Sequence, residues 1–169
     1  MDLLECIVSR RSIRKFTGEP VDEPTVERLL RAAMAAPSAG NQQSWRFIVL
    51  QDRDVRVKVA ECSPYAQMLP DAAVGIVVCG ETEGEKHPGY WVQDCSAAVE
   101  NLLLAACALG LGAVWLGFHP NEPRARCCQE VLGMPEHIVP MAVIAIGHPA
   151  EEKPPADRFD PAFVRKNHW

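Results

Sequence analysis

The sequence predicts a mixed α/β sandwich, in which a central sheet is covered by helices. Its 169 residues are about the length of one domain, and no repeat or low-complexity linker divides residues 1–169. Apolar runs of strand length alternate along the chain with stretches of helical periodicity. One of these helical stretches has few charges, which is typical of a helix at the centre of a fold or an interface.

The first half of the chain is expected to hold three helices and two strands. Apolar residues recur at helical spacing near the start, which predicts a short helix over residues 3–9. The next helix begins after the cap residue Asp22 and stops at Pro37. A strand, a weak helix and a second strand follow at residues 47–50, 53–62 and 72–79. Continuous apolar sequence in the strands indicates that both faces of the sheet are covered.

The second half repeats the alternation after a polar loop at residues 81–90. A long helix with apolar residues on nearly all sides is expected over residues 91–111. A strand, a helix and a strand follow at residues 113–118, 122–132 and 138–146. The stretch 102–118 has no charged residue, but it is short and contains glycines, so we interpret it as core rather than a membrane span.

The last residues differ in character from the rest of the chain. Residues 149–169 contain four prolines and no periodicity, which is compatible with a disordered terminus. They also contain Phe159, Phe163 and Trp169, and large apolar groups are unusual in a disordered tail. We therefore favour the interpretation that residues 150–169 form a C-terminal arm that reaches a partner subunit.

Composition narrows the possible partners and location. The net charge of −5 gives no reason to expect nucleic acid as a partner. Seven cysteines, an odd number without a CxxC pair, and no N-terminal signal pattern predict free thiols and a cytoplasmic location. Histidines and cysteines are not clustered at ligand spacing, so no metal site is expected.

The strongest concentration of positive charge is at Arg10, Arg11 and Arg14, with Ser12 among them. Guanidinium groups bind phosphate in a bidentate manner, and a hydroxyl adds a further donor. The residues alone leave two interpretations open, an anion site and a solvated surface patch.

Two further segments could shape a ligand site. Residues 37–45, Pro-Ser-Ala-Gly-Asn-Gln-Gln-Ser-Trp, join a helix to a strand and offer many hydrogen-bonding groups. Residues 110–117, Gly-Leu-Gly-Ala-Val-Trp-Leu-Gly, lead from a helix into a strand, which is the reverse of a dinucleotide-binding fingerprint. Their glycines instead allow close packing and close approach of the backbone to a flat ligand.

These segments occur together in one known family. The run Arg10–Phe16, the 37–45 loop, Asn101–Ala106, Gly110–Gly117 and Ile146–Pro149 recur in this order, and in this respect the chain resembles the nitroreductase family of FMN-dependent NAD(P)H oxidoreductases. The resemblance covers nearly the whole length. It implies an α+β fold with a central mixed or antiparallel sheet sandwiched by helices, and an intertwined homodimer with FMN at the subunit interface.

The resemblance also implies a set of FMN-binding residues. Arg10 and Ser12 would hold the phosphate, with Arg11 contributing mainly backbone, and Arg14 would face the N1/O2 edge of the flavin. Leu116 and Gly117 would place a backbone N–H near flavin N5. A late basic residue, Arg158 or alternatively Lys153, would join the phosphate. The partner subunit would contribute Pro37, Ser38, Ala39 and Asn41 of the loop, and Gln43 of the same loop would also bind the cofactor.

No catalytic side chain is expected, because the flavin carries the chemistry while the protein binds and orients it. By resemblance, NADH or NADPH delivers hydride to N5, and a small oxidant such as a nitroaromatic or quinone is then reduced in ping-pong fashion. Two alternatives remain. One is another flavin reaction on the same scaffold, reductive dehalogenation or flavin fragmentation, and the other is a non-catalytic flavin-binding or storage protein.

Overall fold

The computed structural model describes residues 2–169, which hold five α-helices and a four-stranded sheet. The helices are α1 (Leu3–Ser9), α2 (Glu23–Met34), α3 (Arg53–Glu61), α4 (Trp91–Ala108) and α5 (Glu122–Leu132). The strands are β1 (Trp45–Leu50), β2 (Val74–Glu81), β3 (Gly112–Gly117) and β4 (Ile138–Gly147). The predicted helices and strands are thus confirmed, with end points that shift by a few residues. Short 3-10 helices η1 (Ala39–Asn41), η2 (Leu69–Asp71) and η3 (Pro161–Phe163) were not predicted.

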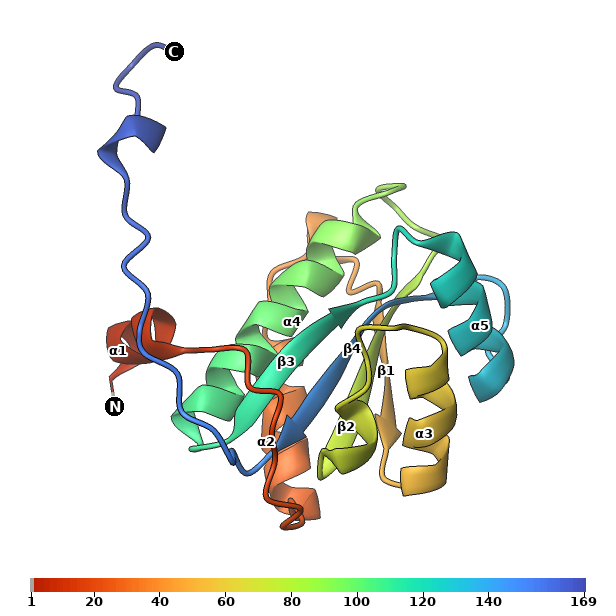
Figure 1. The fold of residues 1–169 in the computed structure, drawn as a ribbon. Helices are drawn as coiled ribbons and strands as arrows, with labels where there is room; N and C mark the ends of the chain where they lie inside the picture. Colours follow the sequence, from red (N-terminus) through yellow and green to blue (C-terminus); the bar gives the residue numbers. More distant parts are fainter. Residues whose placement is uncertain (1) are drawn as a thin grey trace.

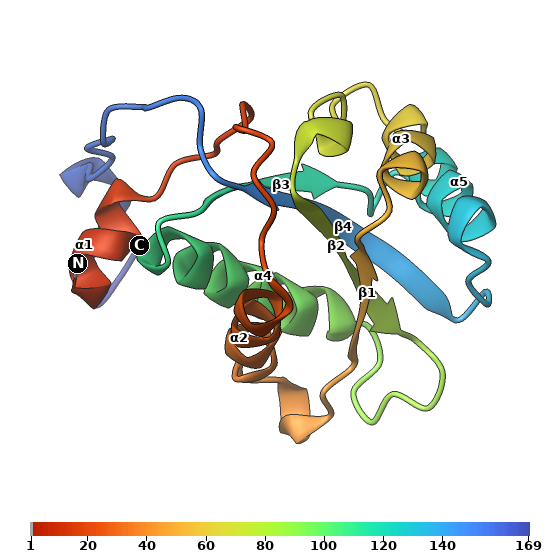
Figure 2. The same cartoon turned by 90° about the horizontal axis from the view of Figure 1, so that it is seen from below.

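The sheet is antiparallel throughout, in the order β1-β2-β4-β3. Helices α2 and α4 cover one face, and α3 and α5 cover the other (Figures 1 and 2). This arrangement confirms the α+β fold with a central sheet between helices. Strand β1 lies at an edge and is only partly buried along its middle, so the expectation that it is covered on both faces holds better for β2 and β4.

Helix boundaries follow from local capping. The Asp2 carboxylate accepts a hydrogen bond from Glu5 N while the Glu5 carboxylate accepts one from Asp2 N, a complete capping box for α1. The Asp22 side chain caps α2 by accepting a hydrogen bond from Thr25 N, and hydrogen bonding with the side chain and then the backbone of Thr25 lowers the pKa of the Asp22 carboxyl. Helix α5 ends at Gly133, whose φ of 63° closes the helix with a left-handed residue.

The core consists of two apolar layers, one on each face of the sheet. Alternate residues of β2 serve the two layers: Ile76 and Val78 pack toward α2 and α4, and Val77 and Cys79 toward α3 and α5. Helix α4 contributes the most to the first layer, as its nearly uncharged sequence predicts. Apolar packing on both faces therefore makes β2 and β4 the rigid centre of the molecule.

Helix α1 differs from the other helices because its apolar stripe is exposed. Within α1, Cys6 alone is buried, and its carbonyl accepts a weak hydrogen bond from the Cys107 thiol of α4. The stripe that predicted the helix faces outward instead of into this chain: Leu3, Leu4, Ile7 and Val8.

The prediction that the cysteines are free thiols is wrong for one pair. Cys62, at the end of α3, forms a disulfide with Cys127 of α5. The two residues are 65 positions apart in sequence, and they meet because α3 and α5 pack side by side on the same face of the sheet. Cys128, the neighbour of Cys127 in the sequence, is a buried free cysteine.

The C-terminal segment leaves the domain beside α1 and extends away from it (Figure 1). Its aromatic side chains are almost fully exposed, with Phe163 82% and Trp169 101% accessible. Within residues 2–169, no helix has both the length and the hydropathy needed to span a bilayer. In the same range, no three His, Cys, Asp or Glu side chains are grouped so that they could hold a metal ion.

Candidate functional site

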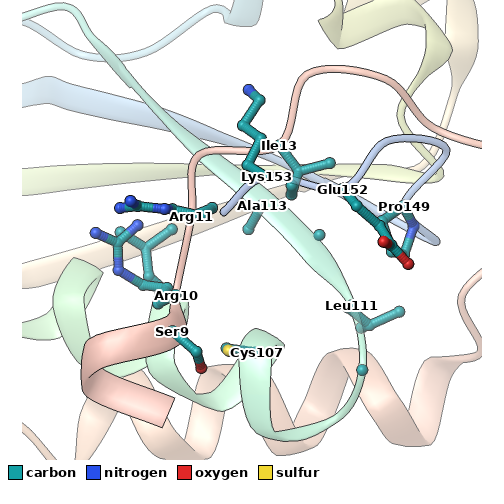
Figure 3. Close-up of a pocket in the computed structure, with 13 residues that line it drawn as sticks. Ser9, Arg10, Arg11, Ile13, Cys107, Leu111, Ala113, Pro149, Glu152 and Lys153 are labelled. Atoms are coloured by element: carbon teal, nitrogen blue, oxygen red, sulfur yellow. The ribbon is translucent and has the colours of Figure 1, made fainter. Parts of the chain in front are cut away.

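The arginine cluster borders a cavity of about 370 Å³ between the end of α1, the end of α4 and the start of the C-terminal segment (Figure 3). Arg10 and Arg11 lie side by side there, and Lys153 comes to the same place from the far end of the sequence. Arg10 forms an ion pair with Glu100 at 3.6 Å, and Arg11 Nε donates to the Pro154 carbonyl at 2.6 Å. The three cations make this cavity suited to an anionic group.

Backbone pairing with β3 fixes the segment that carries these residues. Ser12 forms a parallel bridge with Ala113, and Ile13 N donates to the Ala113 carbonyl at 3.0 Å. This close approach requires glycine at position 112, because a Cβ there would lie 2.6 Å from Ile13 Cγ2. The sequence-based inference that the glycines permit tight packing is therefore confirmed at Gly112.

A second anchor comes from the segment after β4. The Glu151 carboxylate accepts a hydrogen bond from Arg14 N at 2.6 Å and lies 3.2 Å from Lys153 Nζ. These contacts, the Arg14 hydrogen bond first, lower the pKa of the Glu151 carboxyl. Lys153 Nζ in turn donates to the Ser12 carbonyl at 2.6 Å. The chain end thus holds residues 12–14 in place from one side while β3 holds them from the other.

A second cavity, of about 500 Å³, lies beyond Arg14 at the end of β3. It is lined by flat and apolar side chains together with two arginines, among them Tyr65, Trp115, Leu116 and Arg124. The Arg124 guanidinium stacks 5.0 Å from the centre of the Tyr65 ring. Gly117 borders the same space, and a Cβ added there would meet nothing within 4 Å, so the backbone is open to a ligand.

Arg14 adds positive charge to the lining of this second cavity. It borders the same space as Tyr65, Trp115 and the open backbone of Gly117. A planar heterocycle with an electron-rich edge matches such a space, because the walls can stack on its ring and the charge can face its edge. The structure therefore brings together Arg10, Arg11, Ser12, Arg14, Leu116 and Gly117 along one edge of the sheet.

The loop after α2 is held by a buried carboxylate on α4. Asp94, 3% exposed, accepts hydrogen bonds from Ala39 N at 2.9 Å, Gln42 Nε2 at 2.8 Å and Ser44 Oγ at 2.9 Å. Ser38 Oγ adds an internal bond, accepting from Gln43 N at 3.0 Å. Asn41 and Gln43 both adopt positive φ, with values of 54° and 53°. Such a conformation is sparsely populated and needs a structure that enforces it, which Asp94 supplies.

This loop does not meet the arginine cluster within one chain. Asp94 lies in the first turn of α4, whereas Cys107, which lines the Arg10 cavity, lies in its last turn. At 1.5 Å of rise per residue, the two positions are about 20 Å apart along the helix axis. Of the residues expected at the cofactor, Pro37, Ser38, Ala39, Asn41 and Gln43 are therefore at the opposite end of α4 from Arg10.

Of the two residues considered as the late basic residue at the phosphate, one lines this cavity and the other does not. Lys153 lines the cavity together with Arg10 and Arg11, whereas Arg158 is exposed on the extended C-terminal segment and is not among the residues that line it. Its role at the phosphate stays a prediction. Sequence reasoning missed Tyr65, Asp94 and Arg124, since none belongs to a recurring motif and each acquires its role only through folding. Trp91 is a core residue that packs on His119.

Comparison with known proteins agrees with this geometry. A family model described as the nitroreductase family matches residues 7–64 and 60–148. A protein of Archaeoglobus fulgidus, provisionally named NADH dehydrogenase/NAD(P)H nitroreductase, is 46% identical and the alignment covers 99% of both chains. A similarly named crystal structure from Parabacteroides distasonis has a TM-score of 0.95 at 40% identity and covers 99% of this chain and 98% of that one. A nitroreductase, also provisionally named, from Desulfovibrio desulfuricans in complex with FMN has a TM-score of 0.88 at 34% identity and covers 100% and 98%. The chain belongs to the nitroreductase family.

Proposed function

We propose that this protein is an FMN-dependent NAD(P)H oxidoreductase that reduces nitroaromatics, quinones or similar small oxidants. One observation carries the proposal: residues 10–14 and strand β3 together border a cationic cavity at Arg10 and an aromatic cavity at the open backbone of Gly117. A phosphate and a flat ring on one ligand match this pair of cavities. The FMN-bound relative from Desulfovibrio desulfuricans supports the same assignment.

The residues present fit the cofactor. Arg10, Arg11 and Lys153 would hold the phosphate, together with the Ser12 hydroxyl, and Arg14 would face the ring edge where negative charge develops on reduction. Leu116, Gly117 and Trp115 would line the space for the ring. Positive charge at Arg14 would stabilise that developing charge, and the hydrogen bond from Arg14 N to Glu151 holds the backbone that carries this side chain.

The chemistry requires no side-chain nucleophile or base. When bound, FMN supplies hydride acceptance from NAD(P)H and transfer to the oxidant. The protein binds the donor and the oxidant in turn over Gly117, and one space used twice gives ping-pong kinetics. Tyr65 and Arg124 border that space and are placed to influence which oxidant fits.

We further propose that the protein is a homodimer in which residues 150–169 reach across to the partner. Two apolar surfaces are exposed within residues 2–169, the outer face of α1 and the aromatic side chains of the C-terminal segment. Exposed apolar groups of this size mark interaction sites. A two-fold partner would also bring its Pro37–Gln43 loop to the cofactor site, as the resemblance implies. A cytoplasmic location stays a prediction, and the Cys62–Cys127 disulfide weakens the cysteine argument for it.

A simple experiment tests the function. Purified protein reconstituted with FMN should be yellow, and NADH or NADPH should bleach it in the absence of oxygen. Addition of a nitroaromatic or a quinone should restore the colour. A yellow protein that neither nicotinamide reduces would point to flavin storage, and a protein that cannot be loaded with FMN would refute the proposal.

A further inference from the structure

A third cavity, of about 630 Å³, lies at the end of the sheet where β1 finishes and β2 starts. Three segments border it: residues 14–20, the first turns of α3, and residues 70–73 around η2. These segments lie side by side in both views of the fold (Figures 1 and 2). The cofactor assignment above leaves this cavity without a ligand.

The side chains that line the cavity are strongly cationic. Arg14, Lys15, Arg53 and Arg56 face a single acid among the lining residues, Asp71. The excess of positive charge contrasts with the net charge of −5 for the whole protein. Asp71 lies 3.8 Å from Arg53, but both side chains are mostly exposed, so this pair leaves most of the positive charge unneutralised.

Arg56 is an independent sign that the cavity accepts a ligand. Its side chain is buried, 6% exposed, with Nη1 donating to the Leu50 and Gln51 carbonyls at 3.2 and 2.7 Å. Its buried Nε has no hydrogen-bond partner among residues 2–169. Burial, followed by the charge of Arg53, lowers the pKa of Arg56, while the charge of Asp52 acts in the opposite direction. An anion in the cavity would favour the charged form of this side chain.

The position of the cavity identifies the kind of anion. Arg14 lines both this cavity and the aromatic cavity at Gly117. A donor whose flat ring lies over Gly117, against the space assigned to the cofactor ring, can therefore extend past Arg14 and place an anionic group beside Lys15 and Arg53. Of the molecules that the reaction uses, the nicotinamide dinucleotide has this form, with a ring at one end and phosphates farther along.

We propose that the cavity lined by Lys15, Arg53 and Arg56 binds phosphate groups of the NAD(P)H donor. The proposal rests on the proposed function, and it assigns the donor a site separate from the FMN phosphate site at Arg10. Lys15 and Arg53 supply exposed charge that attracts the phosphates, and Arg56 supplies fixed positive charge from the buried wall.

The double variant Lys15→Gln/Arg53→Gln tests the proposal with little risk to folding, because both side chains are exposed. Arg28→Gln/Lys58→Gln is the matched control, since it removes two exposed cations that line none of these three cavities. We expect KM for NADH and NADPH to rise about five- to tenfold in the test variant, the change that corresponds to roughly 1–1.4 kcal/mol. FMN affinity and kcat should match the control.

Reduced nicotinamide riboside, which has the same ring and no phosphate, separates phosphate binding from other effects. Its KM should be the same in the test variant, the control and the wild type. An unchanged KM for both dinucleotides, or an equal rise for the riboside, would overturn the phosphate site and leave the proposed function intact.

A second measurement tests the anion site independently of the proposed function. It is needed if neither NADH nor NADPH reduces the flavin, because that result would refute the proposed function and leave the anion site undecided. Inorganic pyrophosphate is titrated into the FMN-loaded protein and binding is followed by calorimetry. Binding that is weakened in Lys15→Gln/Arg53→Gln but not in the control supports the anion site. No binding, or equal binding in both variants, overturns it.

Discussion

Replacing Asp94 by alanine should loosen the Ala39–Ser44 loop and weaken FMN binding. The carboxylate is buried and accepts three hydrogen bonds of 2.8–2.9 Å from this loop. A hydrogen bond to a charged group contributes about 1.5–3 kcal/mol, but such values are not additive and two of the donors can regain water. We therefore expect a loss of roughly 2–4 kcal/mol in the free energy of unfolding.

The measurement is urea unfolding of the FMN-free protein, followed by flavin fluorescence titration of the same samples. Asp94→Asn should fall between wild type and Asp94→Ala, because the amide keeps one acceptor oxygen but turns the other position into a donor. Asp54→Ala, which removes an exposed acid from α3, should change stability by no more than about 0.5 kcal/mol. If Asp94→Ala matched Asp54→Ala in both stability and FMN affinity, the reasoning about the loop would be refuted.

Three other expectations concern the cofactor, the dimer and pH. Arg10→Ala should weaken FMN binding by about 1.5–3 kcal/mol, the scale of a lost charge-assisted bond, while Arg28→Ala should not; fluorescence titration compares them, and equal affinities would contradict the phosphate assignment. Deleting residues 155–169 removes the exposed aromatic anchors and should raise the dimer dissociation constant in sedimentation experiments; an unchanged constant would show that the segment is not an arm. Burial raises the pKa of the Cys128 thiol from 9.0 to about 12, so the unfolded thiol ionises first and stability should fall as pH rises from about 9 toward 12. Urea midpoints from pH 7 upward should show a shallower decline for Cys128→Ala, and identical slopes would argue against this thiol as the cause.

Local signals in the sequence predicted the elements well. Cap residues such as Asp22 and the change between helical and strand periodicity set boundaries that the structure reproduces within a few residues. The sequence also allowed the roles of two glycines to be predicted. Gly112 permits a close backbone contact, and Gly117 leaves open space. The order of the strands in the sheet could not be predicted from the sequence, since it depends on which distant segments pair.

The site residues that sequence reasoning missed share one physical cause. Asp94 and Arg56 are charged residues within helices, where the ordinary expectation is a solvent-facing side chain. Their burial depends on partners supplied by other parts of the chain, the 39–44 loop for Asp94 and the end of β1 for Arg56. The Cys62–Cys127 disulfide could not be predicted for the same reason, because only the folded chain brings α3 and α5 together.

The separation of the two candidate ligand-binding segments by the length of α4 has a genetic consequence in the proposed dimer. A subunit damaged at Arg10 still presents a sound Pro37–Gln43 loop, and a subunit damaged in that loop still presents a sound Arg10. Each is inactive when paired with itself, yet a mixed pair contains one undamaged composite site and one with both defects. Two defective alleles expressed together should therefore complement each other and restore part of the activity, as is usual for active sites shared between subunits.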